Sequence, residues 1–331
     1  MYTINDLIDY VNNHLIYSTL KIKEPSIYLK KVFEQVEEKN INYIMERLYK
    51  RNFGVVISDK YCFDPSQKQI FFPLNKNSDI IAILHEFGHS FDFIKIEDKT
   101  STRSRSGTTQ ISIAMSNSFV LSNGMTLDDT IKKEIKETGQ KIYEDLMGEY
   151  DKIVSSIITQ EELDVYNSYD SLKEQYMELK KRVRKRSPYL FIRDKNYYNN
   201  DDVNIMVNYL DLSKFKDKNE ALNVLKQVKS LEEKVYGNKE YSIIVNKIYK
   251  SELYIKFIND NSIVLDALGR KYNLKNKVPT HTVGYYKKSG TLGSEFFANC
   301  FAQKMLNEEA GYVIKYLPNS YKAFLELFDI I

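Results

Sequence analysis

The segment from 80 to 91 constrains the fold of this chain more than any other segment. Its apolar residues recur at the three- and four-residue intervals that place side chains on one face of a helix. These residues are Ile80, Ile81, Ile83, Leu84, Phe87 and Phe91. Ser78 and Asp79 precede them, and such side chains cap the first turn of a helix. The pattern therefore predicts a buried helix that begins near residue 80.

Within this helix the sequence reads His85-Glu86-Phe87-Gly88-His89. Residues four apart project from one helix face, so His85 and His89 can direct their imidazoles at one ion, with Glu86 beside it. A zinc ion with three protein ligands keeps a position for water and lowers the pKa of that water towards about 7. Glu86 can then take a proton from the water and pass it to a leaving amine. The spacing predicts a Zn2+ site with a general base, against the alternative that two histidines fell four apart by chance.

A third ligand is needed, and Glu295 is the strongest candidate. It lies in a segment whose large apolar side chains predict another buried helix face. They are Phe296, Phe297, Phe301 and Met305. A lone carboxylate on such a face needs a cation or a strong partner, and zinc would be that cation. The alternative is a carboxylate near a helix start that the helix dipole stabilises.

The residues before this second helix include three candidates for a catalytic role. The hydroxyl of Tyr285 or Tyr286, or the imidazole of His281, could donate a hydrogen bond to the oxyanion that forms when water adds to a peptide carbonyl. Because the chain has 26 tyrosines, position alone does not choose between these candidates. The remaining histidine, His14, lies outside both segments and is expected to be an ordinary surface or half-buried residue.

The rest of the chain predicts a mostly helical fold with a small sheet. Two short strands are expected near 54–58 and 69–73, with a turn between them. Glycine and proline are sparse after residue 100, where long amphipathic stretches predict helices. We therefore predict an α+β fold, predominantly α, in four parts. These are N-terminal helices at 1–45, a first half of the site-bearing domain at 46–100, a long helical insertion at 101–261 and a second half at 262–331.

Charge and cysteine content argue against several classes of protein. The 48 basic and 45 acidic residues leave a net charge of +3, which is too balanced to predict a nucleic-acid or membrane partner. The basic run from Lys180 to Arg186 could meet phosphate or acidic lipid, but a solvated helix end is the commoner reason for such a run. Cys62 and Cys300 are far apart, so the chain has neither a disulfide framework nor a CxxC motif.

The sequence has no recognisable targeting segment. Residues Met1 to Asp6 lack the basic and apolar regions of a secretory signal, and no apolar run reaches transmembrane length. The expected location is cytoplasmic, unless the protein is carried in a virion or exported by a signal-independent route.

Two motifs carry a likeness to known proteins. The first is His-Glu-Phe-Gly-His at 85–89, followed by Ser-Phe-Asp at 90–92, and the second is Glu-Phe-Phe-Ala-x-x-Phe at 295–301. Together they resemble the anthrax lethal factor-like zinc metallopeptidases, a family that includes Pro-Pro endopeptidases and zincin domains of phage head proteins. The resemblance covers about 53–95 and 262–331 and implies a zincin fold of the gluzincin type.

This resemblance implies a role for each matching residue. His85, His89 and Glu295 would bind zinc, Glu86 would be the base, and a tyrosine before the second motif would assist. The implied function is hydrolysis of peptide bonds, by a zinc-bound water, in a protein or peptide substrate. The alternative is a phage- or toxin-associated zincin-fold protein with a structural or binding role and little or no peptidase activity. Such a protein would be expected to lose Glu86 first, so its presence favours the enzyme.

The chain departs from the family in three respects. The long segment 90–294 separates the two motifs, which family members place closer together. Counted back from Glu295, the position of the assisting tyrosine is Lys288, so Tyr285 or Tyr286 would have to reach the site by a different loop. Asn299 stands where the family often has an acidic residue, which predicts a weaker orientation of one ligand.

Overall fold

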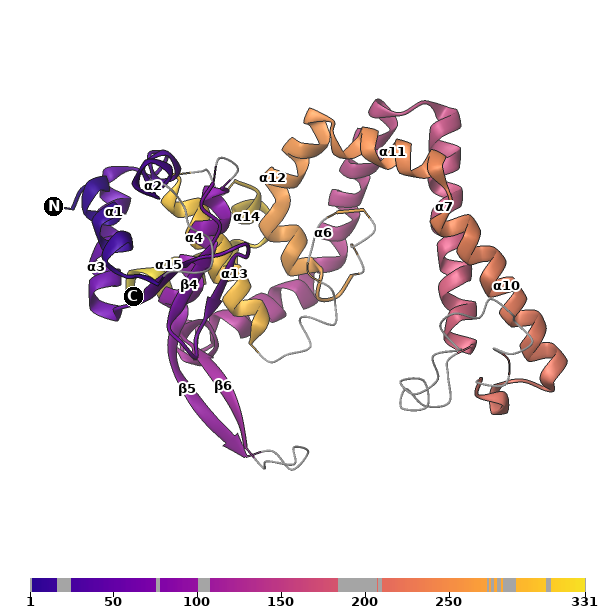
Figure 1. Ribbon diagram of the computed structural model, residues 1–331, viewed down its shortest axis with the longest axis horizontal. Helices are drawn as coiled ribbons and strands as arrows, with labels where there is room; N and C mark the ends of the chain where they lie inside the picture. The colour runs from indigo at the N-terminus through magenta and orange to yellow at the C-terminus, as the bar shows by residue number, and fades with distance from the viewer. Residues whose placement is uncertain are drawn as a thin grey trace. The chain divides into compact units, whose positions relative to one another are not determined.

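The computed structural model describes most of the chain, and the described residues are mainly helical (Figure 1). They are 2–16, 25–75, 78–100, 108–183, 207, 210–272, 274, 277–278, 281, 290–307 and 311–330. They form two compact units. The first combines Met1–Leu146 with Ile258–Ile331, and the second is Met147–Phe257. Helices with a small sheet make this an α+β fold that is mainly α, as the sequence predicts.

Three helices open the first unit. They are α1 (Ile4–Asn13), α2 (Pro25–Phe33) and α3 (Glu38–Arg51). Helix α1 begins with a capping box, because the side chains of Thr3 and Asp6 each accept a hydrogen bond from the other residue's backbone N–H. Helix α3 continues past residue 45, the predicted end of the N-terminal helices.

A four-stranded sheet has the strand order β1-β2-β4-β3. Its strands are β1 (Leu15–Ile16), β2 (Gly54–Ile57), β3 (Cys62–Asp64) and β4 (Gln69–Phe72). Strands β1, β2 and β4 are parallel, whereas β3 pairs antiparallel with β4 and forms one edge of the sheet. The two predicted strands are β2 and β4. The others have two and three residues, which is too short for alternation to reveal them.

A β-hairpin corrects the prediction that residues 101–261 are helical throughout. Strand β5 (Phe93–Thr100) pairs antiparallel with β6 (Thr108–Ala114), and the two extend together away from the four-stranded sheet (Figure 1). The residues of β6 read Thr-Thr-Gln-Ile-Ser-Ile-Ala. Threonine and isoleucine are branched at Cβ and favour strands, so this local preference outweighs the scarcity of glycine and proline.

Aromatic side chains join the helices that carry the candidate site. The main helices here are α4 (Ile80–Asp92), α13 (Thr291–Met305) and α15 (Pro318–Ile330), with the shorter α5 (Met115–Ser118) and α14 (Gly311–Tyr316). The rings of Phe91 and Phe301 lie 5.3 Å apart, as do those of Phe297 and Phe324. All four side chains are fully buried, and burial of each contributes about 1.5–3 kcal/mol relative to exposure. These contacts hold α4 and α15 against α13.

The second unit is helical and has its own aromatic core. Helices α6 (Leu127–Ile157) and α12 (Glu252–Leu268) each run from one unit into the other. The remaining elements are α7 (Gln160–Arg182), η3 (Leu212–Lys214), α10 (Lys218–Tyr236) and α11 (Lys239–Tyr249). The rings of Tyr169 and Tyr241 stack with centroids 3.4 Å apart. The hydroxyls of Tyr150 and Tyr166 are hydrogen-bonded at 2.6 Å, so large polar aromatics pack here without leaving these buried hydroxyls unpaired.

The described part of the basic run lies at the end of α7. Lys180 pairs with Glu232, and Arg182 forms a 2.8 Å ion pair with Glu220. Residues 184–186 lie outside the described residues. Ion pairs with side chains of α10 are what a solvated helix end forms.

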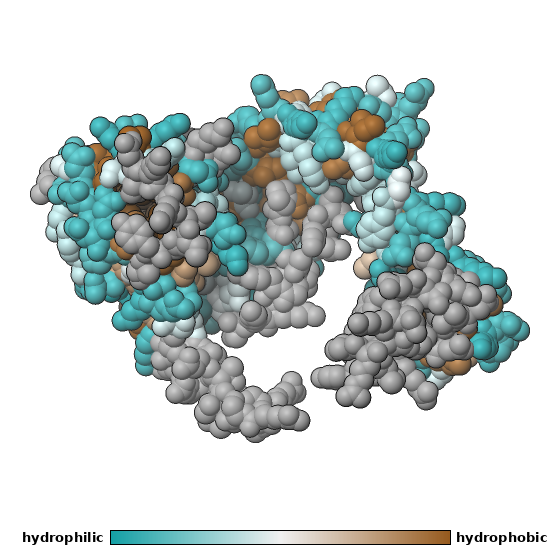
Figure 2. All heavy atoms as spheres, viewed as in Figure 1, coloured by the Kyte–Doolittle hydropathy of each residue, from teal (hydrophilic) through white to brown (hydrophobic). Residues whose placement is uncertain are grey.

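The molecular face in Figure 2 is mostly hydrophilic, and its hydrophobic residues form small separate groups. Among the large hydrophobic side chains that the structure describes, Tyr236 and Ile243 have the largest exposed fractions, at 72% and 66%. Among the residues that the structure describes, no helix is both long and apolar enough to cross a membrane.

A candidate metal centre

Helix α4 positions His85, Glu86 and His89. It begins at the predicted place, where the Asp79 side chain accepts a hydrogen bond from the Ile81 backbone N–H at 2.9 Å. The predicted apolar residues bury one side of the helix in the core, except Ile81, which is 47% exposed. The two histidines project from another side, four residues apart, with their rings 4.6 Å from each other.

Helix α13 brings Glu295 to the same place. A side chain from another helix stabilises its first turn: the Gly293 backbone N–H donates a hydrogen bond to Asp128 of α6 at 3.0 Å. Gly290 precedes the helix with a φ of +81°, a left-handed conformation that favours glycine. Glu295 itself is only 4% exposed. It lies in the second turn of the helix, where the dipole of the N-terminus is weaker than in the first turn.

The two helices approach so closely that only glycine fits at position 88. A Cβ added to Gly88 would lie 2.7 Å from the Cα of Ala298, well inside contact distance. Both positions are in helix interiors, so neither atom can move without the helices separating. Gly88 lies between the two histidines in sequence, and Ala298 follows Glu295 by one helical turn. This small-residue contact therefore sets how near the histidines come to Glu295, and no sequence pattern predicts it.

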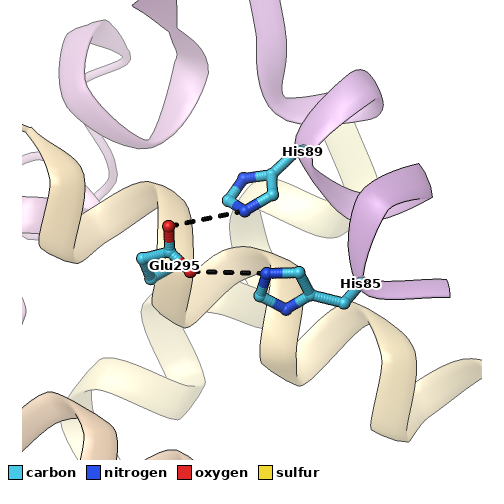
Figure 3. A group of neighbouring side chains, drawn as sticks. All are labelled: His85, His89 and Glu295. Carbon is cyan, nitrogen blue, oxygen red and sulfur yellow. Dashed lines mark ion pairs between the residues drawn. The ribbon is translucent and has the colours of Figure 1, made fainter. Parts of the chain in front are cut away.

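The three side chains converge with distances that suit zinc (Figure 3). The His85 Nε2 atom lies 3.3 Å from Glu295 Oε2, and the His89 Nε2 atom lies 3.6 Å from Glu295 Oε1. One potential ligand atom from each residue lies within 4.8 Å of the others. In a tetrahedral zinc site with bonds of about 2.0–2.1 Å, neighbouring donor atoms are about 3.3 Å apart. Two imidazoles and a carboxylate at such distances are a ligand set that zinc prefers.

Neutral side chains of α13 form hydrogen bonds with the Nδ1 atom of each histidine, the ring nitrogen that faces away from Glu295. The Nδ1 of His85 lies 2.8 Å from Asn299 Oδ1, and the Nδ1 of His89 lies 3.2 Å from Ser294 Oγ. Ser294 in turn hydrogen-bonds to the buried carboxylate of Asp92. Burial raises the pKa of Asp92, whereas the hydrogen bond with Ser294 lowers it, as a bond donated to a carboxylate does. Ser294 therefore donates to Asp92 and accepts from His89. Neither Ser294 nor Asp92 was predicted from the sequence as a partner of a candidate ligand.

Asn299 orients His85, contrary to the expectation that it would weaken the orientation of a ligand. Its amide oxygen faces His85, while its amide nitrogen donates to Asp266 Oδ2 at 3.4 Å. An amide can satisfy a donor and an acceptor at the same time. The partners of Asn299 and Ser294 thus favour a proton on Nδ1 of both histidines.

This proton arrangement creates a need for a cation. With Nδ1 protonated, His85 and His89 each direct the lone pair of Nε2 at the carboxylate of Glu295. Three acceptors that converge in a buried place require either a metal ion or additional protons. In the metal-free protein, additional protons on Nε2 of the histidines meet this need. Burial opposes ionisation of Glu295, but the hydrogen bonds that both histidines then donate, together with their positive charge, outweigh burial and hold the pKa of this carboxyl well below its usual range. Glu295 is therefore ionised at neutral pH and available to bind a cation.

Glu86 lies beside the three converging side chains. Glu86 is only 8% exposed. Burial is the main cause that raises the pKa of its carboxyl above the ordinary value, although the positive charges of His89 and His85 lower it. The Phe63 backbone N–H donates a hydrogen bond to its carboxylate. A glutamate whose pKa is raised towards neutrality is better matched to the transfer of protons at neutral pH.

A cavity of about 360 Å³ lies over these residues. Its walls include His85, Glu86, His89 and Glu295. Strand β3 and the following turn add Cys62, Phe63 and Pro65, and the hairpin adds Phe93, Ser112 and Ala114. All of these residues belong to the first unit.

Cys62 and Cys300 differ in their access to this cavity. Cys62 is half-buried and lines it, whereas Cys300 is fully buried. Burial and the nearby Glu86 carboxylate raise the pKa of the Cys62 thiol. Among the described residues, Cys62 is not one of the side chains whose ligand atoms converge at the candidate site.

His281 is the one candidate assisting residue that lies within the described part of the chain. It lines the cavity, and its Nδ1 lies 3.1 Å from Asp266 Oδ1. The Asp266 carboxylate also accepts from the His281 backbone N–H at 3.1 Å. The hydrogen bond to Asp266 is the main cause that raises the pKa of His281. Tyr285 and Tyr286 lie outside the described residues, as does Lys288.

His14 lies apart from this group, as expected. Its half-buried ring stacks on Tyr10 with centroids 3.9 Å apart, and its Nδ1 hydrogen-bonds to the Tyr10 carbonyl at 2.9 Å.

Comparison with protein-family models, curated proteins and solved structures finds no match. The chemistry of the site must therefore be argued from its own residues.

Removal of Glu295 is expected to abolish stoichiometric zinc binding. Glu295→Ala would take away the anionic ligand, so the loss should exceed the roughly 10- to 100-fold typical of an outer-shell substitution. The measurement is zinc content after dialysis, together with a titration against a chromophoric chelator.

A matched control separates loss of a ligand from loss of the fold. Glu134 is equally buried, in α6, and accepts hydrogen bonds from the backbone N–H groups of Asn319 and Ser320. Glu134→Ala should lower the thermal midpoint but keep zinc. If Glu295→Ala bound zinc as tightly as wild type, Glu295 would not be a ligand.

Zinc binding is expected to weaken with falling pH from above pH 6.5. In the metal-free protein burial lowers the pKa of His89, but the hydrogen bond to Glu295 and the negative charges of Glu295, Glu86 and Asp92 together outweigh burial, so the net pKa is raised above 6.5. A raised histidine pKa means that the proton is bound at higher pH than usual and competes there with zinc for Nε2. Chelator competition at a series of pH values measures this, and an affinity that stays constant down to about pH 6 would contradict it.

Proposed function

We propose that this chain is a zinc-dependent metallopeptidase of the zincin type. The observation that carries the proposal is the convergence of His85, His89 and Glu295, with Glu86 beside them in the wall of a cavity. A small sheet next to the helix with the first motif, and a second helix with the distant glutamate, support a zincin fold. The substrate class that follows is a protein or peptide.

Glu86 is the general base in this proposal. Zinc, when bound by His85, His89 and Glu295, would lower the pKa of a water molecule and polarise the carbonyl of the peptide bond. Glu86 accepts the proton of the attacking water and then donates it to the leaving amine. The Phe63 backbone N–H, which bonds to the Glu86 carboxylate, keeps that carboxylate in the cavity wall.

His281 is the described residue best suited to stabilise the oxyanion. Asp266 holds both its backbone N–H and its Nδ1, which fixes the imidazole in the wall of the cavity. An imidazolium donates a charge-assisted hydrogen bond, and the raised pKa of His281 extends the pH range in which this form exists. Tyr285 and Tyr286 stay as alternative donors.

The test is digestion of a mixed peptide library by zinc-loaded protein, followed by identification of the new termini. We expect cleavage that 1,10-phenanthroline abolishes and that stoichiometric zinc restores. Glu86→Gln protein, purified in the same way, controls for contaminating metallopeptidases. Zinc binding without cleavage of any library would instead favour the alternative, a zincin-fold protein with a structural or binding role.

A further inference from the structure

Asn299 contacts both halves of the candidate site. Its amide oxygen lies 2.8 Å from Nδ1 of His85, and its amide nitrogen lies 3.4 Å from Oδ2 of Asp266. Asp266 in turn holds the ring and the backbone N–H of His281. Asn299 follows Glu295 by one turn of α13, so the same helix carries a ligand and this bridging side chain.

We propose that Asn299 is a positioning residue that couples the orientation of His85 to that of His281, and that this coupling requires an amide. The proposal rests on the proposed function for the roles of these two histidines. It assigns to Asn299 two separate tasks. One is to fix the proton of His85 on Nδ1, so that Nε2 is free for the metal, and the other is to fix the Asp266 carboxylate that holds His281.

The chemistry of the two partners explains why an amide is needed. His85 Nδ1 presents a donor to Asn299, whereas the ionised carboxylate of Asp266 presents only acceptors. A carboxylate at position 299 would serve His85 but would repel Asp266 at 3.4 Å. An apolar side chain would serve neither. Asparagine is the residue of this size that satisfies both partners without adding charge.

The other histidine supports this reading with a second side chain of the same type. Ser294 accepts from His89 and donates to Asp92, so a hydroxyl does there what the amide does at His85. Both histidines are thus linked to a buried aspartate through a neutral group that accepts and donates at once. On the His89 side, the chain of hydrogen bonds ends at Ser116, whose backbone N–H and hydroxyl both donate to Asp92. Asp266, by contrast, continues to His281 in the cavity wall, so only the Asn299 branch links a ligand to a potential catalytic residue.

Two substitutions of Asn299 separate its tasks. Asn299→Leu removes both hydrogen bonds at similar volume, and we expect zinc to bind about 10- to 100-fold more weakly. Asn299→Asp keeps an acceptor for His85 and loses the donor for Asp266. At about pH 8, we expect the zinc affinity of Asn299→Asp to stay within about threefold of wild type. Its kcat should nevertheless fall.

The readout that does not depend on activity is the ring spectrum of 15N-labelled histidine. The chain has only four histidines, so each ring can be assigned by substitution. In zinc-loaded wild type, His85 should carry its proton on Nδ1. Asn299→Asp should leave the His85 signals in place and shift those of His281, whereas Asn299→Leu should perturb both.

Gln303→Leu is the matched control, because it removes an amide from the same helix. Among the described residues, the Gln303 side-chain oxygen has no hydrogen-bond partner, so zinc affinity and the His85 and His281 signals should not change. Thermal unfolding of each variant checks that it is folded.

Two results would overturn the coupling. One is that Asn299→Leu binds zinc as tightly as wild type. The other is that Asn299→Asp keeps full activity and an unchanged His281 spectrum. The zinc and spectral measurements stand even if wild type cleaves no peptide, so failure of the coupling and failure of the proposed function can be told apart.

Discussion

Replacement of Glu86 by glutamine is expected to lower kcat/KM by about 10²- to 10⁴-fold, which is what a general acid–base residue contributes. Glutamine has the shape of glutamate and can still accept a hydrogen bond from the Phe63 backbone N–H, but it cannot take a proton from water. Because His85, His89 and Glu295 are unchanged, the variant should retain one zinc ion per chain. Loss of activity with retention of metal is the expected signature of a missing base.

The measurement is the initial rate on a peptide identified from the library, with zinc content determined on the same sample. Glu46→Gln is a suitable control, because Glu46 is exposed on α3 and the substitution makes the same chemical change away from the cavity. It should keep the wild-type rate. Equal rates for Glu86→Gln and wild type would remove Glu86 from the mechanism. Loss of zinc from Glu86→Gln would mean that the Glu86 carboxylate contributes to zinc binding rather than to proton transfer.

Replacement of Gly88 by alanine is expected to destabilise the fold and weaken the metal site together. The added Cβ would lie 2.7 Å from the Cα of Ala298, so α4 and α13 must separate. Overpacking of this kind costs about 1–3 kcal/mol, and a clash with backbone belongs at the upper end because no side chain can rotate away. Separation would also lengthen the distances from His85 and His89 to Glu295, so we expect zinc affinity to fall by about 10-fold or more.

Gly148→Ala is the matched control for this substitution. Gly148 is also inside a helix, α6, but a Cβ there would have no neighbouring atom within 4 Å. Alanine should therefore stabilise that helix by about 0.5–1 kcal/mol and leave zinc affinity unchanged. Thermal unfolding and chelator competition measure both effects. If Gly88→Ala had the same thermal midpoint and zinc affinity as wild type, the close contact with Ala298 would not set the geometry of the site.

Local patterns account for the parts of the fold that were predicted correctly. The cap at Asp79 and the buried face of α4 follow from residues near each other in the chain, as do strands β2 and β4. The hairpin of β5 and β6 was not predicted, because scarcity of glycine and proline does not distinguish a helix from a strand. Its β-branched residues carried the correct information. The division into units at 147 and 257 depends on which helices pack together, and no change of composition marks it.

The sequence by itself determined the half of the site that depends on helical geometry. Since a helix repeats every 3.6 residues, a spacing of four placed His85 and His89 on one face whatever the rest of the chain did. Glu295 could be named as a partner because an isolated carboxylate on an apolar helix needs a cation. Its distance from the histidines could not be known. That distance depends on the contact between Gly88 and Ala298, two small residues that lie in different helices and have no distinctive pattern around them.

Only the tertiary structure decided how the ligands are held. Ser294, Asn299, Asp92 and Asp266 act through hydrogen bonds between helices, and the geometry of such bonds depends on the packing of segments distant in sequence. Asn299 shows the difference most clearly. By its residue type it was expected to weaken the orientation of a ligand, yet its place between His85 and Asp266 lets one amide satisfy a donor and an acceptor.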